Sequence, residues 1–571
     1  MALPGADPIA AALAAGETPS PEMVAASTEK EGLSPRAAGW CFAAAIVLIA
    51  TIPFIVAHNT VLAKAPLENP PDVLAFEARK ILNQFGYTQK PKTVAFGFQT
   101  PEPAYPAWLD QHDRSHRDAI LTTHQPPIIG FWFRQHVDLL IPRTRTPGPP
   151  VPAVDYDEPA NIEPGMIRLI LDANGRLFAL EARPEEKGPR NSADPFNWSA
   201  LFSAAGLDRA RFTEATPEHT PPMAFDARAA WTGDYGEGRL EKVRVEAAAW
   251  QGRPVYFKIS GDWGLSPIGQ RAVGLFTAFL IGLVVLILGG NAAVAWNNLR
   301  LGRGDRRGAN RVAIFAFIIA LCEWSCTNAH TASLWELALI FTGLSEALFV
   351  AASIWLFYIA IEPYVRRFWP DSLISFTRLY SGRLRDPLVA SHLLLAVLLA
   401  AGLDVLFNGM FFLNPTSTRV PGLLPLESMS GTVRFWLENM RTGLLIVLAF
   451  VLLVVLLRLL FRGSWIAYVG ASVVAAAIGF VPAAGWIAIG IVGTGLVISF
   501  YAYVWALRRF GLLTVAGASL ASSFLIGLPV IPGSWYVGRS LLGLGILAAV
   551  ACWASWTILM AQRRVMVTQG N

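Results

Sequence analysis

The sequence predicts a polytopic α-helical membrane protein of about ten spans, with an α+β domain inserted outside the cytoplasm. Three observations predict this fold class. Hydrophobic residues make up 54% of the 571 residues and charged residues only 15%, against a soluble average of about 25%. Apolar runs of the length that crosses a bilayer recur along the chain. Arginines follow every second run, as expected of loops that face the cytoplasm.

The first apolar run, 37–57, follows a polar linker at 1–36 that we place in the cytoplasm. The triplet Ala63-Lys64-Ala65 beyond it has the small-x-small pattern of a cleaved signal peptide. However, the run is long for the apolar part of a signal peptide, and its leader is about twice the usual length. We therefore expect the run to be an uncleaved transmembrane anchor.

The segment 58–268 is long enough to form its own core, and we expect it to be an extracytoplasmic α+β domain. Periodicity and turn residues predict its elements: helix 72–85 before Gly86, strands 93–98 and 128–133, a hairpin 166–182 turning at Asn174-Gly175, helix 198–205 before Gly206, and a hairpin 242–259 turning at Gln251-Gly252. A helix followed by strands occurs twice in this order. We interpret the domain as two small similar lobes or a divergent repeat.

The segment 269–564 is expected to be a nine-span bundle, followed by a cytoplasmic tail at 565–571. Its apolar runs are 273–297, 312–329, 334–361, 389–413, 442–461, 465–481, 485–507, 512–530 and 541–560. The segment 464–507, which turns around Pro482 to Gly485, forms either two spans or a re-entrant hairpin.

Arginine placement predicts the orientation, because every even-numbered span ends in arginine while the opposite short loops carry only Arg419, Arg434, Arg441 and Arg539. Both termini should therefore be cytoplasmic and 58–268 extracytoplasmic, in the plasma (inner) membrane. The richest loop contributes a candidate cytoplasmic contact surface for membrane lipids or a signalling protein, formed by Arg366, Arg367, Arg378, Arg383 and Arg385.

Four acidic residues within the apolar runs form the candidate intramembrane polar site. We expect Glu323 and Glu346 near mid-membrane, and Glu336 and Asp404 nearer the outer face. Ionised carboxylates are costly in hydrocarbon and are often functional there. Two interpretations remain open: hydrogen bonding between helices, or a site for a ligand, proton or cation.

No catalytic set and no metal or cofactor site is predicted. His116-Arg117-Asp118 spells the kinase catalytic triplet, but Thr123 stands where the metal-binding asparagine is required, and no glycine-rich loop accompanies it. Cys322, Cys326 and His330 share a helix face, but they lack a fourth metal ligand. Nothing in the sequence indicates a nucleic-acid partner.

Segments spread over nearly the whole chain carry a family resemblance: LPGADPIAAALAAGETPSPEMVAAS (3–27), HDRS (112–115), SALFSAAGL (199–207), TPPMAFDARAAWTG (220–233), VEAAAWQGRPVYF (245–257), SEALFVAASIWLFYIAIEPYVRRFWP (345–370) and SGRLRDPL (381–388). Together they are similar to the carboxyl-terminal part of a group of bacterial serine/threonine protein kinases. In that group a cytoplasmic kinase domain is followed by a linker, a span, an exported domain and a polytopic bundle.

In that family the LPGxDP-like linker follows the kinase domain, whereas here it begins at Leu3, so no catalytic residue can be carried over. The resemblance implies a non-catalytic membrane sensor or scaffold that relays an envelope signal to a cytoplasmic kinase or other signalling protein. Its extracytoplasmic ligand is unknown. Two alternatives remain: a transporter or channel that uses the intramembrane carboxylates, and a fragment of a full kinase whose catalytic domain lies upstream.

Overall fold

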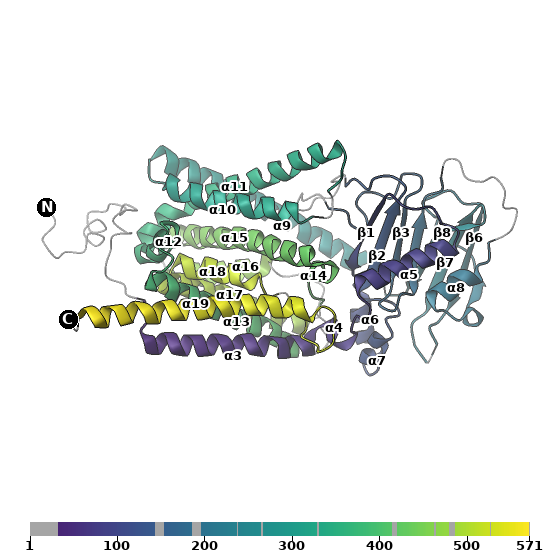
Figure 1. The fold of residues 1–571 in the computed structure, drawn as a ribbon, viewed down its shortest axis with the longest axis horizontal. Helices are drawn as coiled ribbons and strands as arrows, with labels where there is room; N and C mark the ends of the chain where they lie inside the picture. The colour runs from purple at the N-terminus through teal and green to yellow at the C-terminus, as the bar shows by residue number, and fades with distance from the viewer. Residues whose placement is uncertain are drawn as a thin grey trace.

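A long helical bundle and a β-sheet domain lie end to end in the computed structural model (Figure 1). The structure describes residues 32–142, 153–185, 196–236, 238–263, 267–327, 330–413, 420–461, 464–478, 486–525 and 527–569. Helix α3 begins and α19 ends at the end of the bundle remote from the sheet, and α12 lies at that same end (Figure 1).

Each of the ten apolar runs contains a helix, although the helix in the run 512–530 ends at Ser522. These are α3 (Pro35–Asn59), α9 (Pro267–Arg300), α10 (Arg306–Ser325), α11 (Trp335–Phe368), α13 (Pro387–Leu413), α15 (Met429–Leu460), α16 (Ser464–Ile478), α17 (Trp486–Arg509), α18 (Leu512–Ser522) and α19 (Val537–Gln569). Among the described residues, eight helices are long and apolar enough to cross a membrane, and α16 and α18 are shorter. The 15 residues of α16 reach about 22 Å. The turn expected at 482–485 lies outside the described residues.

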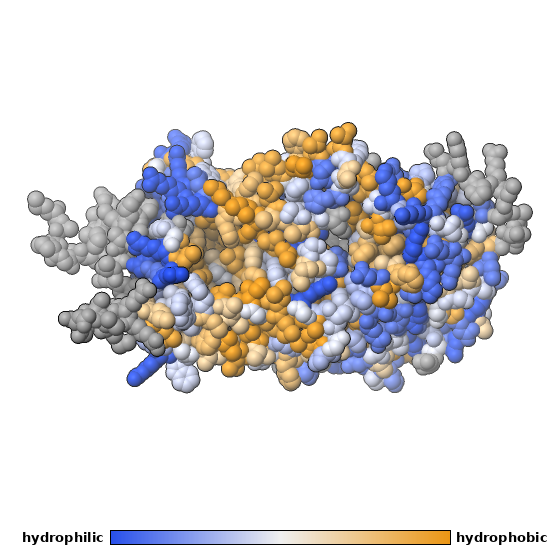
Figure 2. Space-filling view, in the orientation of Figure 1, coloured by the Kyte–Doolittle hydropathy of each residue, from blue (hydrophilic) through white to orange (hydrophobic). Residues whose placement is uncertain are grey.

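The surface of the bundle is apolar in its middle and polar at both ends. Figure 2 shows an orange belt over the helices between the blue sheet domain and a blue patch at the remote end. Large side chains point outward from this belt, among them Trp40, Phe54, Phe341 and Phe349, each at least 66% exposed. Such a belt belongs against lipid, so the chain is a multi-pass membrane protein.

Two apolar clusters hold the bundle together. One joins α13 to α3, α18 and α19, and the other joins α15 to α10, α11 and α16. Three short helices connect or flank the long ones: α12 (Ile374–Tyr380), α14 (Leu424–Glu427) and the 3₁₀ turn η2 (Pro370–Leu373).

A proline inside α11 is accommodated by a side chain from α9. Pro363 has no N–H, so the carbonyl of Ile359 loses its usual partner one turn later. The Nδ2 group of Asn298 donates to the carbonyl oxygens of Ile359 and Ala360, at 3.0 and 3.1 Å. These buried bonds fix α9 against the C-terminal part of α11.

The sheet domain contains one eight-stranded antiparallel sheet of order β1-β2-β3-β4-β8-β7-β6-β5. Its strands are β1 (Thr93–Gln99), β2 (Gly130–His136), β3 (Ile167–Leu171), β4 (Leu177–Ala182), β5 (Thr213–Ala215), β6 (Ala227–Gly233), β7 (Val243–Trp250) and β8 (Arg253–Gly261). Its helices are α4 (Val61–Lys64), α5 (Pro71–Gln84), α6 (Tyr105–His112), α7 (Arg117–Thr122), α8 (Ser199–Ala205) and the 3₁₀ turn η1 (Arg209–Arg211). Helices α5 and α8 lie on the same face of the sheet (Figure 1).

The two halves of the domain share one sheet and one core. Each half places a helix, α5 or α8, before four strands, and the last strands of the halves pair with each other, β4 with β8. Residues of both halves belong to a single hydrophobic cluster. The interpretation of the domain as a divergent repeat stays a prediction.

Local sequence signals placed most of these elements correctly. The turns at Gly175 (φ 82°) and Gly252 (φ 73°) lie where the hairpins were predicted, and Gly206 (φ 63°) ends α8. The strand predicted at 128–133 is displaced to Gly130–His136. Strands β5 and β6 and helices α4, α6 and α7 were missed, because they are short or their apolar residues do not show a clean period.

The sheet domain docks on the bundle through its edge strand β1. Glu427, at the end of α14, accepts a hydrogen bond from the backbone N–H of Phe98. Around this contact, Leu426 and Trp436 from the bundle belong to the same hydrophobic cluster as Phe98. Trp535 stacks on Phe98 and donates from Nε1 to the carbonyl of Leu67 at 3.1 Å. We call this set of residues the docking contact.

The docking contact requires glycine at position 97. A Cβ atom there would overlap the carboxylate of Glu427 and lie 2.9 Å from the Trp132 ring. We therefore expect Gly97→Ala to destabilise docking by about 1–3 kcal/mol, measured as faster hydrogen exchange of β1. Gly39→Ala, where a Cβ meets nothing within 4 Å, is the control.

The overlap with Glu427 can be separated from a general effect of alanine in a strand. The penalty of Gly97→Ala should shrink in a Glu427→Ala background, because the two positions are in contact. Equal penalties in both backgrounds would contradict this account of the contact.

Candidate functional site

The candidate intramembrane acids do not form one site, and the structure separates them into three places. Glu323, near the C-terminal end of α10, forms a bidentate ion pair with Arg441 of α15. The Nε···Oε2 distance is 2.7 Å and the Nη2···Oε1 distance 3.2 Å. Their side chains are only 2% and 8% exposed. A buried ion pair of this geometry neutralises both charges and ties α10 to α15.

Arg441 was assigned to an outer loop from the sequence, and this assignment is wrong. Helix α15 begins at Met429, well before the apolar run, because Ser428 caps it by accepting from the N–H of Gly431 at 2.9 Å. Arg434 also lies on this helix. A serine N-cap ahead of the run was the sequence signal that could have found the true start.

Glu346 of α11 lies beside this ion pair. It is buried, and it interacts electrostatically with Arg441, Glu323 and Glu438. Within the described residues, its Oε1 atom has no hydrogen-bond partner. The structure thus brings together two of the four predicted acids and adds Glu438 and Arg441, which sequence analysis did not include.

The other two acids lie elsewhere. Glu336 lies at the start of α11. It pairs at 2.8 Å with His330, which lies in the segment that connects α10 to α11. Asp404 accepts from Asn408 at 2.9 Å, and the carbonyl of Asn408 accepts from Asn59 at the end of α3. The first contact orders a connection, and the second ties α13 to α3.

The five arginines of the predicted contact surface fall into a paired group and an exposed group. Arg366 is buried, where it pairs with Glu362 at 2.8 Å and donates to the carbonyl of Arg303. Arg378 pairs with Asp386 at 3.2 Å. Arg367, Arg383 and Arg385 are exposed. Two of the five are therefore structural, and three are available to a partner.

The chain that leads into α3 is fixed beside this arginine loop. The N–H of Leu33 donates to Ser391 Oγ at 2.8 Å, and Gly32 lies against the carbonyl of Pro387 at the start of α13. The linker therefore reaches the bundle next to Arg383 and Arg385. Helix α3 then runs without interruption to Asn59 at the sheet domain.

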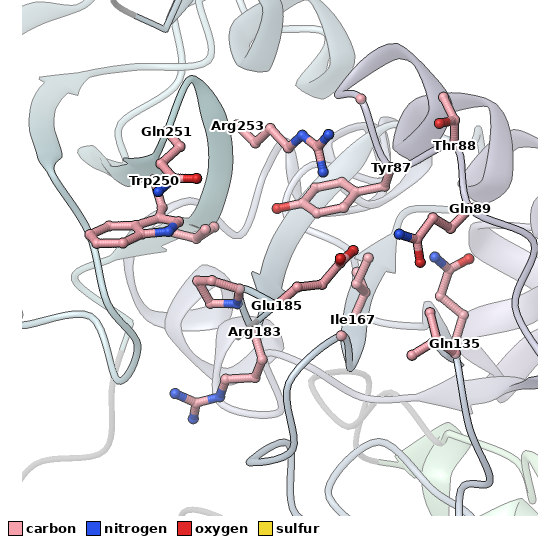
Figure 3. Close-up of a pocket in the computed structure, with 15 residues that line it drawn as sticks. Tyr87, Thr88, Gln89, Gln135, Ile167, Arg183, Glu185, Trp250, Gln251 and Arg253 are labelled. Atoms are coloured by element: carbon pink, nitrogen blue, oxygen red, sulfur yellow. The ribbon is translucent and has the colours of Figure 1, made fainter. Parts of the chain in front are cut away.

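A second candidate site is a pocket of about 200 Å³ in the sheet domain (Figure 3). It lies at one end of the sheet, beside the C-terminal ends of β2 and β4, the N-terminal ends of β3 and β8, and the turn that follows α5. Charged, amide and aromatic side chains line it, including Tyr87, Gln135, Glu185, Trp250 and Arg253. A concave site with a few converging polar groups is the ordinary form of a small-molecule site.

The motifs rejected from the sequence have structural roles. Arg117 of the kinase-like triplet is buried and pairs with Asp110 at 2.8 Å. His330 pairs with Glu336, as described. Among the described residues, no group of three or more His, Cys, Asp or Glu side chains could hold a metal ion.

Electrostatics at the docking contact centre on Glu427, which lies outside the membrane-spanning segments. Burial raises the pKa of Glu427 to about 7, although Arg434 and the Phe98 N–H act in the opposite direction and Asp155 adds to the increase. The docking contact therefore contains a carboxyl group that titrates near neutral pH.

Comparison of the chain with protein-family models, curated proteins and solved structures finds no match. The kinase-like resemblance therefore stays a prediction.

The Glu323–Arg441 pair should be important for stability only as a pair. Glu323→Gln leaves Arg441 buried without its partner and should cost about 3–5 kcal/mol. The double variant Glu323→Leu/Arg441→Met should recover most of this loss. Reversible unfolding in mixed detergent measures both variants.

Glu438→Gln is the matched control for this pair, because it removes a neighbouring acid, on the same helix as Arg441, without removing the Glu323–Arg441 ion pair. A double variant as unstable as Glu323→Gln would contradict the structural role of the pair.

Docking should weaken as pH rises. A carboxyl group whose pKa is raised in the docked state stabilises that state below the pKa of the undocked group, near 4.5, and loses this contribution as pH rises through about 7. The hydrogen-exchange protection factor of Phe98 should fall about tenfold for each pKa unit that separates the two states.

Glu427→Gln keeps an acceptor for the Phe98 N–H and does not titrate, so its protection should be independent of pH in this window. The same pH dependence in wild type and Glu427→Gln would show that another group is responsible.

Proposed function

We propose that the chain is a non-catalytic membrane sensor or scaffold module that relays an extracytoplasmic signal to the cytoplasm. The observation that carries the proposal is the docking contact: the sheet domain and the bundle share one hydrophobic cluster, joined by the Glu427 carboxylate and the Phe98 N–H. A rearrangement of the sheet domain therefore acts on packed side chains of the bundle. The similarity to the membrane part of bacterial serine/threonine kinases supports the same function.

Two helices provide physical connections to the cytoplasmic surface. Helix α3 leads from the sheet domain to the linker bound beside the arginine loop. Helix α15 leads from the docking contact past Arg441 to Arg458, whose guanidinium lies 4.2 Å from the Phe368 ring centroid at the end of α11. In packed helices, a displacement at one end is transmitted because the core cannot deform continuously.

In this proposal the bundle crosses the inner membrane of a bacterium through its eight long apolar helices, and the shorter helices α16 and α18 pack within the bundle. Both termini and the exposed arginines lie in the cytoplasm, and the sheet domain lies outside. Arg367, Arg383 and Arg385 then face anionic lipids or a signalling protein such as a kinase, either encoded upstream in the same protein or separate. The arginine asymmetry supports this orientation.

A transporter or channel is the second candidate, and two observations favour it. Within the described residues, Glu346 Oε1 lacks a hydrogen-bond partner. A cavity of about 270 Å³ lies between α15, α17 and α18, lined by polar groups that include Asn439, Tyr503 and Ser519. Against this candidate, Glu323 is already neutralised by Arg441, which leaves Glu346 and Glu438 as the acids of this cluster for transport.

The relay predicts that breaking the docking contact changes the cytoplasmic surface. Glu427→Lys places a cation near Arg434 and should undock β1. We expect hydrogen exchange of residues 381–386 and of Leu33 to change by about fivefold or more, the low end of allosteric coupling. The measurement uses the full chain in lipid nanodiscs.

Met429→Lys is the control, because it adds a lysine to the neighbouring exposed position without touching β1. Faster exchange at Phe98 with no change at 381–386 would refute the relay. Proton or cation flux in proteoliposomes that is lost in Glu346→Gln would favour the transporter, and phosphotransfer by the purified chain would refute the non-catalytic assignment.

A further inference from the structure

The pocket of the sheet domain contains two opposite charges that do not neutralise each other. It lies at one end of the central strands, and the turn after α5 and the β7–β8 hairpin enclose it. Arg253 contributes a guanidinium from the hairpin, and Glu185 contributes a carboxylate from the chain after β4 (Figure 3). Among the described residues, neither group forms a salt bridge or hydrogen bond.

The side chain of Arg253 is held in place by its contacts with Gly86 and Tyr87. Its side chain passes over Gly86, where a Cβ would lie 3.4 Å from Nε, and Gly86 has a φ of 85° that favours glycine. The guanidinium carbon lies 5.8 Å from the centroid of the Tyr87 ring. The Tyr87 hydroxyl donates to the carbonyl of Pro254 at 2.9 Å, which anchors this ring to the hairpin. The cationic side of the pocket is therefore preorganised.

Glu185 lies on the other side of Tyr87. Figure 3 shows its carboxylate between the Tyr87 ring and Ile167. Arg253 and Glu185 both act on the Tyr87 hydroxyl electrostatically, with opposite signs, so the two charges flank the same ring. Arg183, although it lines the pocket, points away from it (Figure 3) and donates to the carbonyl of Asn161.

The remaining walls suit an apolar group. Trp250 stands opposite Tyr87 across the pocket (Figure 3), and Val255 and Ile167 line it as well. The volume of about 200 Å³ is far more than a single buried water molecule requires. This is the size of a small organic molecule, and aromatic walls favour one with an apolar part.

We propose that this pocket binds a free α-amino acid with an apolar side chain, its carboxylate on Arg253 and its ammonium on Glu185. A guanidinium pairs with a carboxylate through two parallel hydrogen bonds. A ligand that carries both charges satisfies both protein groups at once, whereas a simple anion or cation leaves one of them desolvated and unpaired. The assignment of this molecule as the signal rests on the proposed sensor function, but its binding does not.

The test is isothermal titration of the full chain in nanodiscs with L-phenylalanine and L-leucine. Two analogues each lack one charge: N-acetyl-L-phenylalanine has no ammonium, and L-phenylalaninamide has no carboxylate. We expect saturable binding of at least one amino acid, and each phenylalanine analogue should bind at least about tenfold more weakly than the parent, the loss expected for one charge-assisted hydrogen bond.

Charge-removing variants identify which group binds which end of the ligand. Arg253→Gln should weaken the binding of the amino acid at least about tenfold and leave the already weak binding of L-phenylalaninamide unchanged. Glu185→Gln should likewise weaken the binding of the amino acid at least about tenfold. It should leave the already weak binding of N-acetyl-L-phenylalanine unchanged. Lys90→Gln, a nearby exposed position outside the pocket, should bind as the wild type does.

No saturable binding of either amino acid by the folded chain would overturn the proposal, as would equal affinity for the analogues and the parent. The proposed sensor function is tested by a different measurement, so its failure can be distinguished from failure of the pocket assignment. If the amino acid binds but the exchange of residues 381–386 does not change, the pocket assignment stands and the relay is refuted. If Glu427→Lys changes that exchange while no amino acid binds, the relay stands and the pocket assignment is refuted.

Discussion

The arrangement of this protein depends on how the edge of its sheet is protected. An edge strand presents unpaired backbone groups that invite association with other chains, and proteins cover or charge such edges. Here β1 and β5 are the two edge strands, and the bundle covers β1: the Glu427 carboxylate accepts the Phe98 N–H, and apolar residues from α14, α15 and the chain before α19 pack around it. Gly97 is required because only a residue without Cβ leaves room for that carboxylate. The two parts of the molecule are therefore joined along one of the two edges of the sheet.

Inside the bundle, a buried ion pair joins two helices. The Glu323–Arg441 pair is buried and satisfied, so it specifies which faces of α10 and α15 meet without leaving a net charge in an apolar region. Glu346 beside it has one oxygen without a partner in the described part of the chain, and it is the residue on which a transport function depends. A relay therefore requires the Glu323–Arg441 pair to hold two helices together, whereas a transporter requires the neighbouring Glu346 to bind the transported ion or proton. The docking contact favours the relay because it connects the bundle to the sheet domain, which contains the pocket proposed to bind an amino acid.

Much of the local structure could be predicted from the sequence. Hydrophobic runs marked all ten bundle helices, and glycines at 175, 206 and 252 marked turns that the structure contains. These signals are local, because they depend on period and on the backbone freedom of single residues. That the two halves share one sheet could not be predicted, because strand pairing between β4 and β8 joins segments far apart in sequence. The start of α15 was misplaced because the apolar run, not the serine cap, was used to begin the helix.

By itself, the sequence determined that the chain crosses a membrane many times, because length and apolarity of a segment suffice to show that it belongs in lipid. It also determined which loops are rich in arginine, the basis of the proposed orientation. Only the tertiary structure decided which acids are neutralised, which arginines are exposed and where the pocket lies. Arg441 and Glu323 are 118 positions apart, and Arg253 and Glu185 come from different halves of the domain, so no local pattern could bring either pair together. Their proximity is a property of helix packing and sheet pairing, which depend on the whole chain.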